Sequence, residues 1–170
     1  GDVVLAGEER EVCAGFGEDG ADLFVVNLEG IPSLLEPPRK PVHDDFRFPA
    51  GRIGWLKERG VDAVSPPNNH AGDAGEQGLL EGMRVLGEAG LGVFGAGANE
   101  EEACQPWLAE AGGVRLACFG ISCFVNGSAG PASPGVRSLP RHRDELERQI
   151  AAARADGRQV IVMVHWGREY

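Results

Sequence analysis

An amide and an imidazole stand side by side in this sequence, at Asn69 and His70, between an apolar run and a predicted helix. Residues 61–65 have the composition of a short strand, and residues 74–89 repeat apolar side chains at helical spacing. The two polar side chains therefore lie on a strand-to-helix turn. In open α/β sheets such turns form the ligand crevice. An ordinary asparagine-rich turn explains the same two residues equally well.

The start of the predicted helix carries its own polar pattern. Asp73 and Glu76 stand three residues apart, which is the spacing of a capping box. We therefore expect Asp73 to cap the helix, so that the helix fixes the turn that carries Asn69 and His70.

Short apolar runs alternate with helical patterns along the chain, which is typical of a layered α/β fold. A length of 170 residues favours one domain spanning residues 1–170. The region 31–49 is rich in proline and is expected to be irregular. The last apolar run, 159–164, has the near-continuous pattern of a strand buried on both faces. Strands are expected at residues 3–5, 22–28, 61–64, 91–94 and 159–164, a hairpin at 106–120, and helices at 52–59, 74–89 and 141–156.

Polar or ionisable residues recur at or near the carboxyl ends of the predicted strands. Parallel strands bring these ends to one edge of a sheet. Carboxylates, imidazoles and a side-chain amide form a nitrogen and oxygen ligand set suited to Mn²⁺, Fe, Zn²⁺ or Mg²⁺. The pattern therefore predicts a metal site. The residues concerned are Asp2, Asn27, Glu29, Asn69, His70 and His165.

The net charge limits the kinds of molecule that the protein is expected to bind. The chain has 16 basic and 26 acidic residues, and its net charge of −10 argues against nucleic acid or an anionic lipid surface as the main partner. Metal cations fit this charge better. The four cysteines show neither a zinc-binding spacing nor a disulfide framework, so structural thiols are expected. No signal peptide or apolar stretch of transmembrane length stands out.

The remaining histidines are expected to lie on the surface. His43 stands in a charged loop, and His142 stands at the start of an exposed amphipathic helix. The serines Ser122, Ser128 and Ser133 have no nearby histidine and aspartate arrangement, so a serine nucleophile is not expected.

Several short motifs in order along the chain carry a family resemblance. They read Gly1-Asp2-Val3-Val4-Leu5, Asn27-Leu28-Glu29-Gly30, Asn68-Asn69-His70-Ala71-Gly72-Asp73-Ala74-Gly75 and His165-Trp166-Gly167-Arg168-Glu169-Tyr170. Taken together, the sequence resembles the CapA family of capsule or poly-γ-glutamate synthesis proteins, a branch of the calcineurin-like metallophosphoesterases. The resemblance covers essentially the whole chain.

The resemblance implies a four-layer α/β/β/α sandwich with two divalent metal ions at the strand ends. It implies that His70 contacts the reacting group rather than a metal, and that Glu169 orients His165 from outside the ligand shell. The metal ligands that it implies are Asp2, Asn27, Glu29, Asn69 and His165. Two cations in such a site can activate water and hold both oxygens of an in-line displacement.

The function that the resemblance implies is a part in capsule or poly-γ-glutamate synthesis, with a site suited to phosphoester hydrolysis. The alternatives are a metal-dependent amide hydrolase and a non-catalytic accessory that binds polymer or assembles a capsule-synthesis complex. The implied partners are an anionic polymer or phosphoester substrate and membrane-bound subunits of a polymer synthase. The implied location is bacterial and extracytoplasmic or membrane-anchored in the full-length protein, and a cytoplasmic location stays open.

The sequence also departs from the family pattern. The broader phosphoesterases begin with an Asp-x-His pair, whereas this chain reads Asp2-Val3-Val4. The family's later Gly-His-Pro-His type motif would lie beyond Tyr170. We therefore expect the domain to be truncated on its C-terminal side, and the chain alone to bind metal weakly and to turn over slowly.

Overall fold

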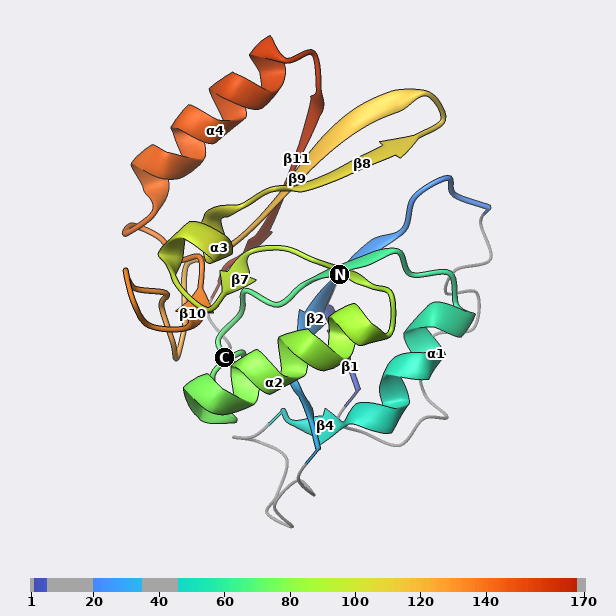
Figure 1. Ribbon diagram of the computed structural model, residues 1–170, viewed down its shortest axis with the longest axis vertical. Coiled ribbons are helices and arrows are strands. Elements are labelled where there is room, and N and C mark those ends of the chain that lie inside the picture. Colours follow the sequence, from blue (N-terminus) through green and yellow to red (C-terminus); the bar gives the residue numbers. More distant parts are fainter. Residues whose placement is uncertain (1, 6–19, 35–45, 168–170) are drawn as a thin grey trace.

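The computed structural model of the chain describes residues 2–5, 20–34 and 46–167, and at positions 2 and 4 only the backbone. This part has a mixed α/β structure (Figure 1), which confirms the class expected from the sequence. The helices are a 3₁₀ turn, η2 (Ala50–Arg52), and α1 (Ile53–Glu58), α2 (Gly75–Glu88), α3 (Glu100–Cys104) and α4 (Arg143–Ala155). The strands are β1 (Asp2–Val4), β2 (Val25–Glu29), β3 (Pro32–Ser33), β4 (Phe48–Pro49), β5 (Ala63–Ser65), β6 (Gly92–Val93), β7 (Ala96–Gly97), β8 (Trp107–Ala111), β9 (Val114–Ser122), β10 (Gly135–Val136) and β11 (Gln159–His165).

The strands form two larger sheets and two short pairs. In the sheet ordered β1-β2-β5-β6, every neighbouring pair is parallel. In the sheet ordered β11-β9-β8, β11 is parallel to β9 and β8 is antiparallel to it. The short pairs are β7 with β10 and β3 with β4. Parallel pairing brings the carboxyl ends of β1, β2 and β5 to one edge, as the sequence predicts.

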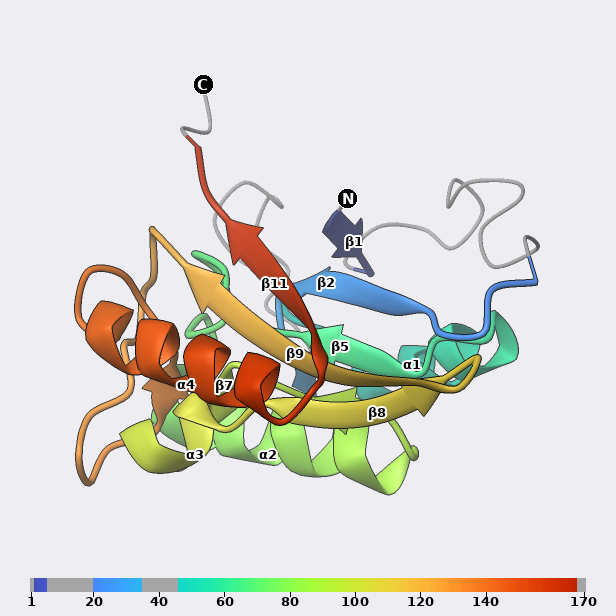
Figure 2. The same ribbon diagram turned by 90° about the horizontal axis from the view of Figure 1, so that it is seen from above.

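Helices pack against each larger sheet. Leu56 of α1 and Leu86 of α2 belong to one buried cluster with Val64 of β5. On the other sheet, Ala153 of α4 packs with Phe119 of β9. Figure 2 shows α4 beside β9 and β11. None of the helices in the described part of the chain has the length and apolarity that a membrane span requires.

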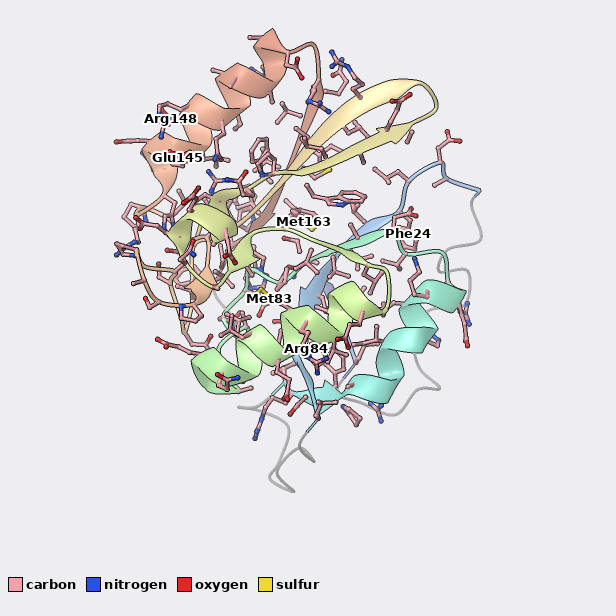
Figure 3. The ribbon with its side chains drawn as sticks, viewed as in Figure 1. Phe24, Met83, Arg84, Glu145, Arg148 and Met163 are labelled. Atoms are coloured by element: carbon pink, nitrogen blue, oxygen red, sulfur yellow. The ribbon has the colours of Figure 1, made fainter. Side chains whose placement is uncertain are left out.

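A further apolar cluster joins the two sheets. It contains Ala63 of β5 and Cys118 of β9, with Val25 of β2 and Met163 of β11 packed against it; Figure 3 labels Met163. Successive side chains of a strand point to opposite faces of the sheet. The faces of β2, β5, β9 and β11 that carry these residues are therefore turned toward each other.

The structure confirms most of the expected elements and corrects the burial of the last strand. The helices expected at 52–59, 74–89 and 141–156 form as α1, α2 and α4, and the expected hairpin forms as β8 and β9. Residues 159–164 do form a strand, but its side chains are half-buried or exposed rather than buried on both faces. Among the described strands β11 pairs only with β9, so it lies at the edge of its sheet.

The proline-rich region is more regular at its ends than expected. Residues 32–33 form β3 and residues 48–49 form β4, and the two strands pair in parallel. The middle of this region, including His43, lies outside the described residues.

Candidate metal centre at the strand ends

Strand alternation positions the polar side chains of the site. Asn27 lies two residues after Val25 in β2, and His165 lies two residues after Met163 in β11. Since Val25 and Met163 pack between the sheets, Asn27 and His165 continue the same faces toward the carboxyl ends. The space between the sheets thus changes from apolar to polar along the strands.

His165 brings two predicted ligands together across a wide separation in the sequence. Its Nε2 lies 2.9 Å from Oδ1 of Asn69, and its Nδ1 lies 3.4 Å from Nδ2 of Asn27. With the proton on Nε2, the ring donates to Asn69 and accepts from Asn27, which is a consistent neutral tautomer. Three of the residues predicted as metal ligands therefore contact one another in a row, with the ring of His165 between the two amides.

A close approach of the two sheets supports this convergence. Gly120 of β9 has no room for a Cβ, because that atom would lie 2.3 Å from Oγ of Ser65 and 2.8 Å from the carbonyl oxygen of Phe94. A glycine at this position allows β9 to lie against the end of β5. The turn that follows β5 is consequently held near the ends of β9 and β11.

Asn68 holds that turn in shape. Its side chain is completely buried, and its Nδ2 donates to the carbonyl oxygens of Leu28 and Pro66, each at 2.8 Å. Its Oδ1 accepts from the backbone N–H of His70, also at 2.8 Å. The side chain thus ties the end of β5 to β2 and fixes the backbone of Asn69 and His70. Asn68 was not among the residues predicted to form the site.

His70 is buried and oriented by Asp73. Its Nδ1 lies 2.9 Å from Oδ2 of Asp73, and its ring packs on Phe46 with centroids 3.9 Å apart. The Asp73 carboxylate also accepts from the backbone N–H of Phe46 at 2.8 Å and from Nδ2 of Asn126 at 2.7 Å. A carboxylate held by these donors fixes the orientation of the imidazole.

This arrangement overturns the expected capping box. The N-cap residue of α2 is Ala74, and no side chain caps that helix end. Asp73 turns instead toward His70, because Asn126 and Phe46 supply donors that a local sequence pattern cannot reveal. The separation of three residues between His70 and Asp73 was the available signal for this pair.

His142 is also placed differently from expectation. It is 5% exposed rather than solvated, and its Nδ1 accepts from the backbone N–H of Ser138 at 2.9 Å. Tertiary packing of the loop before α4 accounts for this burial.

Ser122, one of the serines considered as a nucleophile, donates from its hydroxyl to the carbonyl oxygen of Phe124.

Of the remaining predicted site residues, the structure describes Glu29, and only the backbone of Asp2. Glu29 ends β2 and is 8% exposed. The backbone of Asp2 in β1 stands opposite Asn27 in register, and Glu169 lies outside the described residues. Within the described part of the chain, no group of three or more histidine, cysteine, aspartate or glutamate side chains could hold a metal ion.

Comparison with known proteins identifies the family. Residues 17–170 match the family described as bacterial capsule synthesis protein PGA_cap. This chain belongs to that family. It is 34% identical over 193 residues to the capsule biosynthesis protein CapA of Bacillus anthracis, which covers 100% of this chain and 46% of that relative.

Other relatives carry related names. The chain is 30% identical over 119 residues to the PGA biosynthesis protein CapA of Bacillus subtilis, covering 68% of this chain and 30% of the relative. It is 33% identical over 174 residues to a probable polyglutamine synthesis accessory protein of Mycobacterium tuberculosis, covering 94% of this chain and 45% of the relative. This member of the capsule synthesis family therefore spans less than half the length of these relatives.

The donor types in this family member are ones that divalent cations accept. Asn69 Oδ1 and His165 Nε2 are 2.9 Å apart in a hydrogen bond, which an ion held by both atoms would have to replace. For Nε2 to bind an ion, the ring proton must move to Nδ1 and find an acceptor. Asn27 supplies that acceptor if its amide turns over and presents Oδ1. The donor set therefore suits a cation that accepts mixed amide and imidazole ligands.

Proposed function

We propose that this chain takes part in making or handling an anionic polymer such as poly-γ-glutamate, and that its strand-end site is a metal-dependent hydrolase site of the phosphoesterase type. The names of the relatives, which refer to capsule, PGA and polyglutamine synthesis, support the polymer. The observation that carries the site is the meeting of Asn27, Asn69 and His165. An anionic polymer and membrane-bound synthase subunits are proposed as partners, in an extracytoplasmic or membrane-anchored setting.

We infer a four-layer α/β/β/α order for the domain. The support is the apolar cluster between β2, β5, β9 and β11, together with α1 and α2 packed on one sheet and α4 on the other.

The residues proposed to hold two cations are Asp2, Glu29, Asn69 and His165, and Asn27, expected from the sequence as a further ligand, is proposed to accept from Nδ1 of His165. When bound, such ions activate water and stabilise charge on the reacting oxygens. The chain's own contribution is positioning: Asn68 fixes the turn that carries Asn69, and strand alternation fixes Asn27 and His165. Glu169 is proposed to orient His165.

His70 is proposed as the acid of the reaction. The carboxylate of Asp73 accepts a hydrogen bond from Nδ1–H, so Nε2 is the nitrogen left to donate a proton to a departing oxygen. The contact with Phe46 fixes the ring plane. A proton delivered from a fixed atom allows a poor leaving group to depart.

A non-catalytic accessory is the second candidate function. It is favoured by the hydrogen bonds among Asn27, Asn69 and His165, in which the two amides and the imidazole serve as one another's partners. In that case the crevice binds polymer or a partner protein. An amide hydrolase would use the same residues on a different bond.

Calorimetric titration of the chain with Mn²⁺ tests the metal site. His165→Ala and Asn69→Ala are each expected to weaken binding on the order of tenfold or more, since each removes one ligand. His70→Ala is expected to leave binding within about twofold of the wild type. His142→Asn is the matched histidine control, because the described side-chain contacts of His142 are with Ser138 and Glu100. Unchanged binding in His165→Ala would refute the metal site.

Hydrolysis of bis(p-nitrophenyl) phosphate with Mn²⁺ then separates the candidates. The hydrolase proposal predicts slow turnover that His70→Ala lowers while binding of Mn²⁺ persists. Binding of Mn²⁺ without any turnover, either by this chain or by a longer form that continues past Tyr170, would instead support the accessory.

A further inference from the structure

A pocket of about 450 Å³ opens between α3 and the beginning of α4. None of its lining residues belongs to the strand-end site. Figure 3 shows Glu145 and Arg148, which line it as an ion pair, at the end of α4 near α3. The other lining residues are Glu100, Glu101, Cys104, Gln105, Arg141, His142, Asp144 and Gln149.

His142 presents a buried donor in the wall of this pocket. The backbone N–H of Ser138 donates to its Nδ1, so the neutral ring carries its proton on Nε2. Burial lowers the pKa of His142, which favours that neutral form. Nε2 is itself buried and has no hydrogen-bond partner among the residues that the structure describes. A buried N–H without an acceptor is unfavourable, so this atom indicates a missing acceptor.

Glu100 occupies the position of that acceptor without reaching it. Its Oε2 is 4.0 Å from Nε2 of His142, which is too long for a hydrogen bond, and accepts from Nη2 of Arg141 at 3.1 Å. Arg141 and His142 thus converge on a single carboxylate oxygen. The Glu100 side chain is 39% exposed, so it can turn into solvent and leave both donors to another carboxylate.

A buried cation lies behind the same wall. Arg137 is fully buried and donates to the carbonyl oxygen of Cys104 at 3.2 Å and to Oε1 of Gln149 at 2.8 Å. Both acceptors belong to residues that line the pocket. No carboxylate pairs with Arg137 in the described part of the chain, and Phe119 lies against its guanidinium at 5.6 Å. A buried charge is stabilised by an anion nearby, which an occupant of the pocket would supply.

We propose that this pocket binds an α-amino acid, whose carboxylate replaces that of Glu100 between Arg141 and His142. The ammonium group of the ligand lies toward Glu101 and Asp144, two exposed carboxylates on the pocket wall. The surplus of acidic side chains around the pocket disfavours a ligand with several negative charges and no positive one. This proposal stands independently of the function proposed for the strand-end site.

A set of matched probes tests the proposal by heteronuclear NMR of the nitrogen-labelled chain. L-Alanine carries both groups, propionate only the carboxylate, and ethylamine only the ammonium. Up to about 100 mM, L-alanine is expected to shift the amides of α3 and the start of α4 and to move the Nε2 proton signal of His142 downfield. Propionate is expected to bind more weakly at the same residues. Ethylamine shifting these amides as strongly as L-alanine, or no shift with L-alanine, would overturn the proposal.

Variants that remove a charge from the pocket should change the affinity for L-alanine in opposite directions. Glu100→Gln removes the resident carboxylate and is expected to tighten L-alanine binding on the order of threefold to tenfold, whereas Arg141→Ala is expected to weaken it on the order of tenfold. Arg143→Ala is the matched control, because Arg143 is exposed at the start of α4 and does not line the pocket. Weaker binding in Glu100→Gln, or an equal loss in Arg143→Ala and Arg141→Ala, would overturn the proposal.

Discussion

Replacement of Asn68 by alanine should destabilise the chain strongly, because this side chain makes three buried hydrogen bonds. Each of these bonds is 2.8 Å long, and the side chain has no exposed surface. A buried hydrogen bond contributes about 1 kcal/mol, and a polar group left without a partner costs about 1–3 kcal/mol more. We therefore expect Asn68→Ala to lower the free energy of unfolding by about 3–5 kcal/mol, out of about 5–15 kcal/mol for a typical domain.

Urea denaturation followed by circular dichroism measures this loss. The midpoint should fall while the slope stays constant, and the melting temperature should fall by about 6–20 °C. Asn126→Ala is the matched control, since Asn126 is exposed and its loss should cost less than half as much. A loss below about 1 kcal/mol in Asn68→Ala would contradict the role assigned to Asn68 in fixing the turn.

Other predictions follow from single contacts. Asp73→Asn should lower phosphodiester turnover on the order of a hundredfold while Mn²⁺ binding stays unchanged, and equal turnover would exclude support of His70 by Asp73. Burial lowers the pKa of His142 in the folded chain, so below about pH 6.5 the unfolded chain binds more protons than the folded chain. The free energy of unfolding should therefore decrease as the pH is lowered, by at most about 1.4 kcal/mol per pH unit. In denaturation experiments between about pH 7 and 5, His142→Asn should reduce the dependence of the free energy of unfolding on pH, and an unchanged dependence would contradict the contribution of His142. Gly87→Ala in α2, where a Cβ meets nothing, should stabilise by about 0.5–1 kcal/mol, and Gly120→Ala should destabilise by about 1–3 kcal/mol in the same denaturation assay; the reverse order would contradict the close approach of the sheets.

The sequence predicted those parts of the fold that local patterns determine. The apolar spacing of α2 and α4, the hairpin of β8 and β9, and the gathering of strand ends at one edge all follow from residue periodicity. The same periodicity carries Asn27 and His165 to the face shared by the two sheets, and the structure brings both to within hydrogen-bonding reach of each other.

Contacts between distant segments were beyond the reach of the sequence. Asp73 satisfies the local rule for a helix cap, yet Asn126, from a loop far along the chain, helps to turn it toward His70. His142 begins an amphipathic helix and would be solvated in isolation, but packing of the preceding loop buries it. The strand β11 has an apolar sequence suited to a sheet interior, and only the pairing of strands reveals that it lies at an edge.

The ring of His165 offers the most direct test of the metal centre. Titration of the nitrogen-labelled chain with Zn²⁺, observed through long-range couplings in the imidazole, reports which ring nitrogen carries the proton. The proposed metal centre predicts that Nε2 would hold the ion and that the ring proton would move to Nδ1 beside Asn27, a change that Asn69→Ala weakens. A His165 ring that keeps its proton on Nε2 while Zn²⁺ saturates the chain would contradict a metal centre at the strand ends.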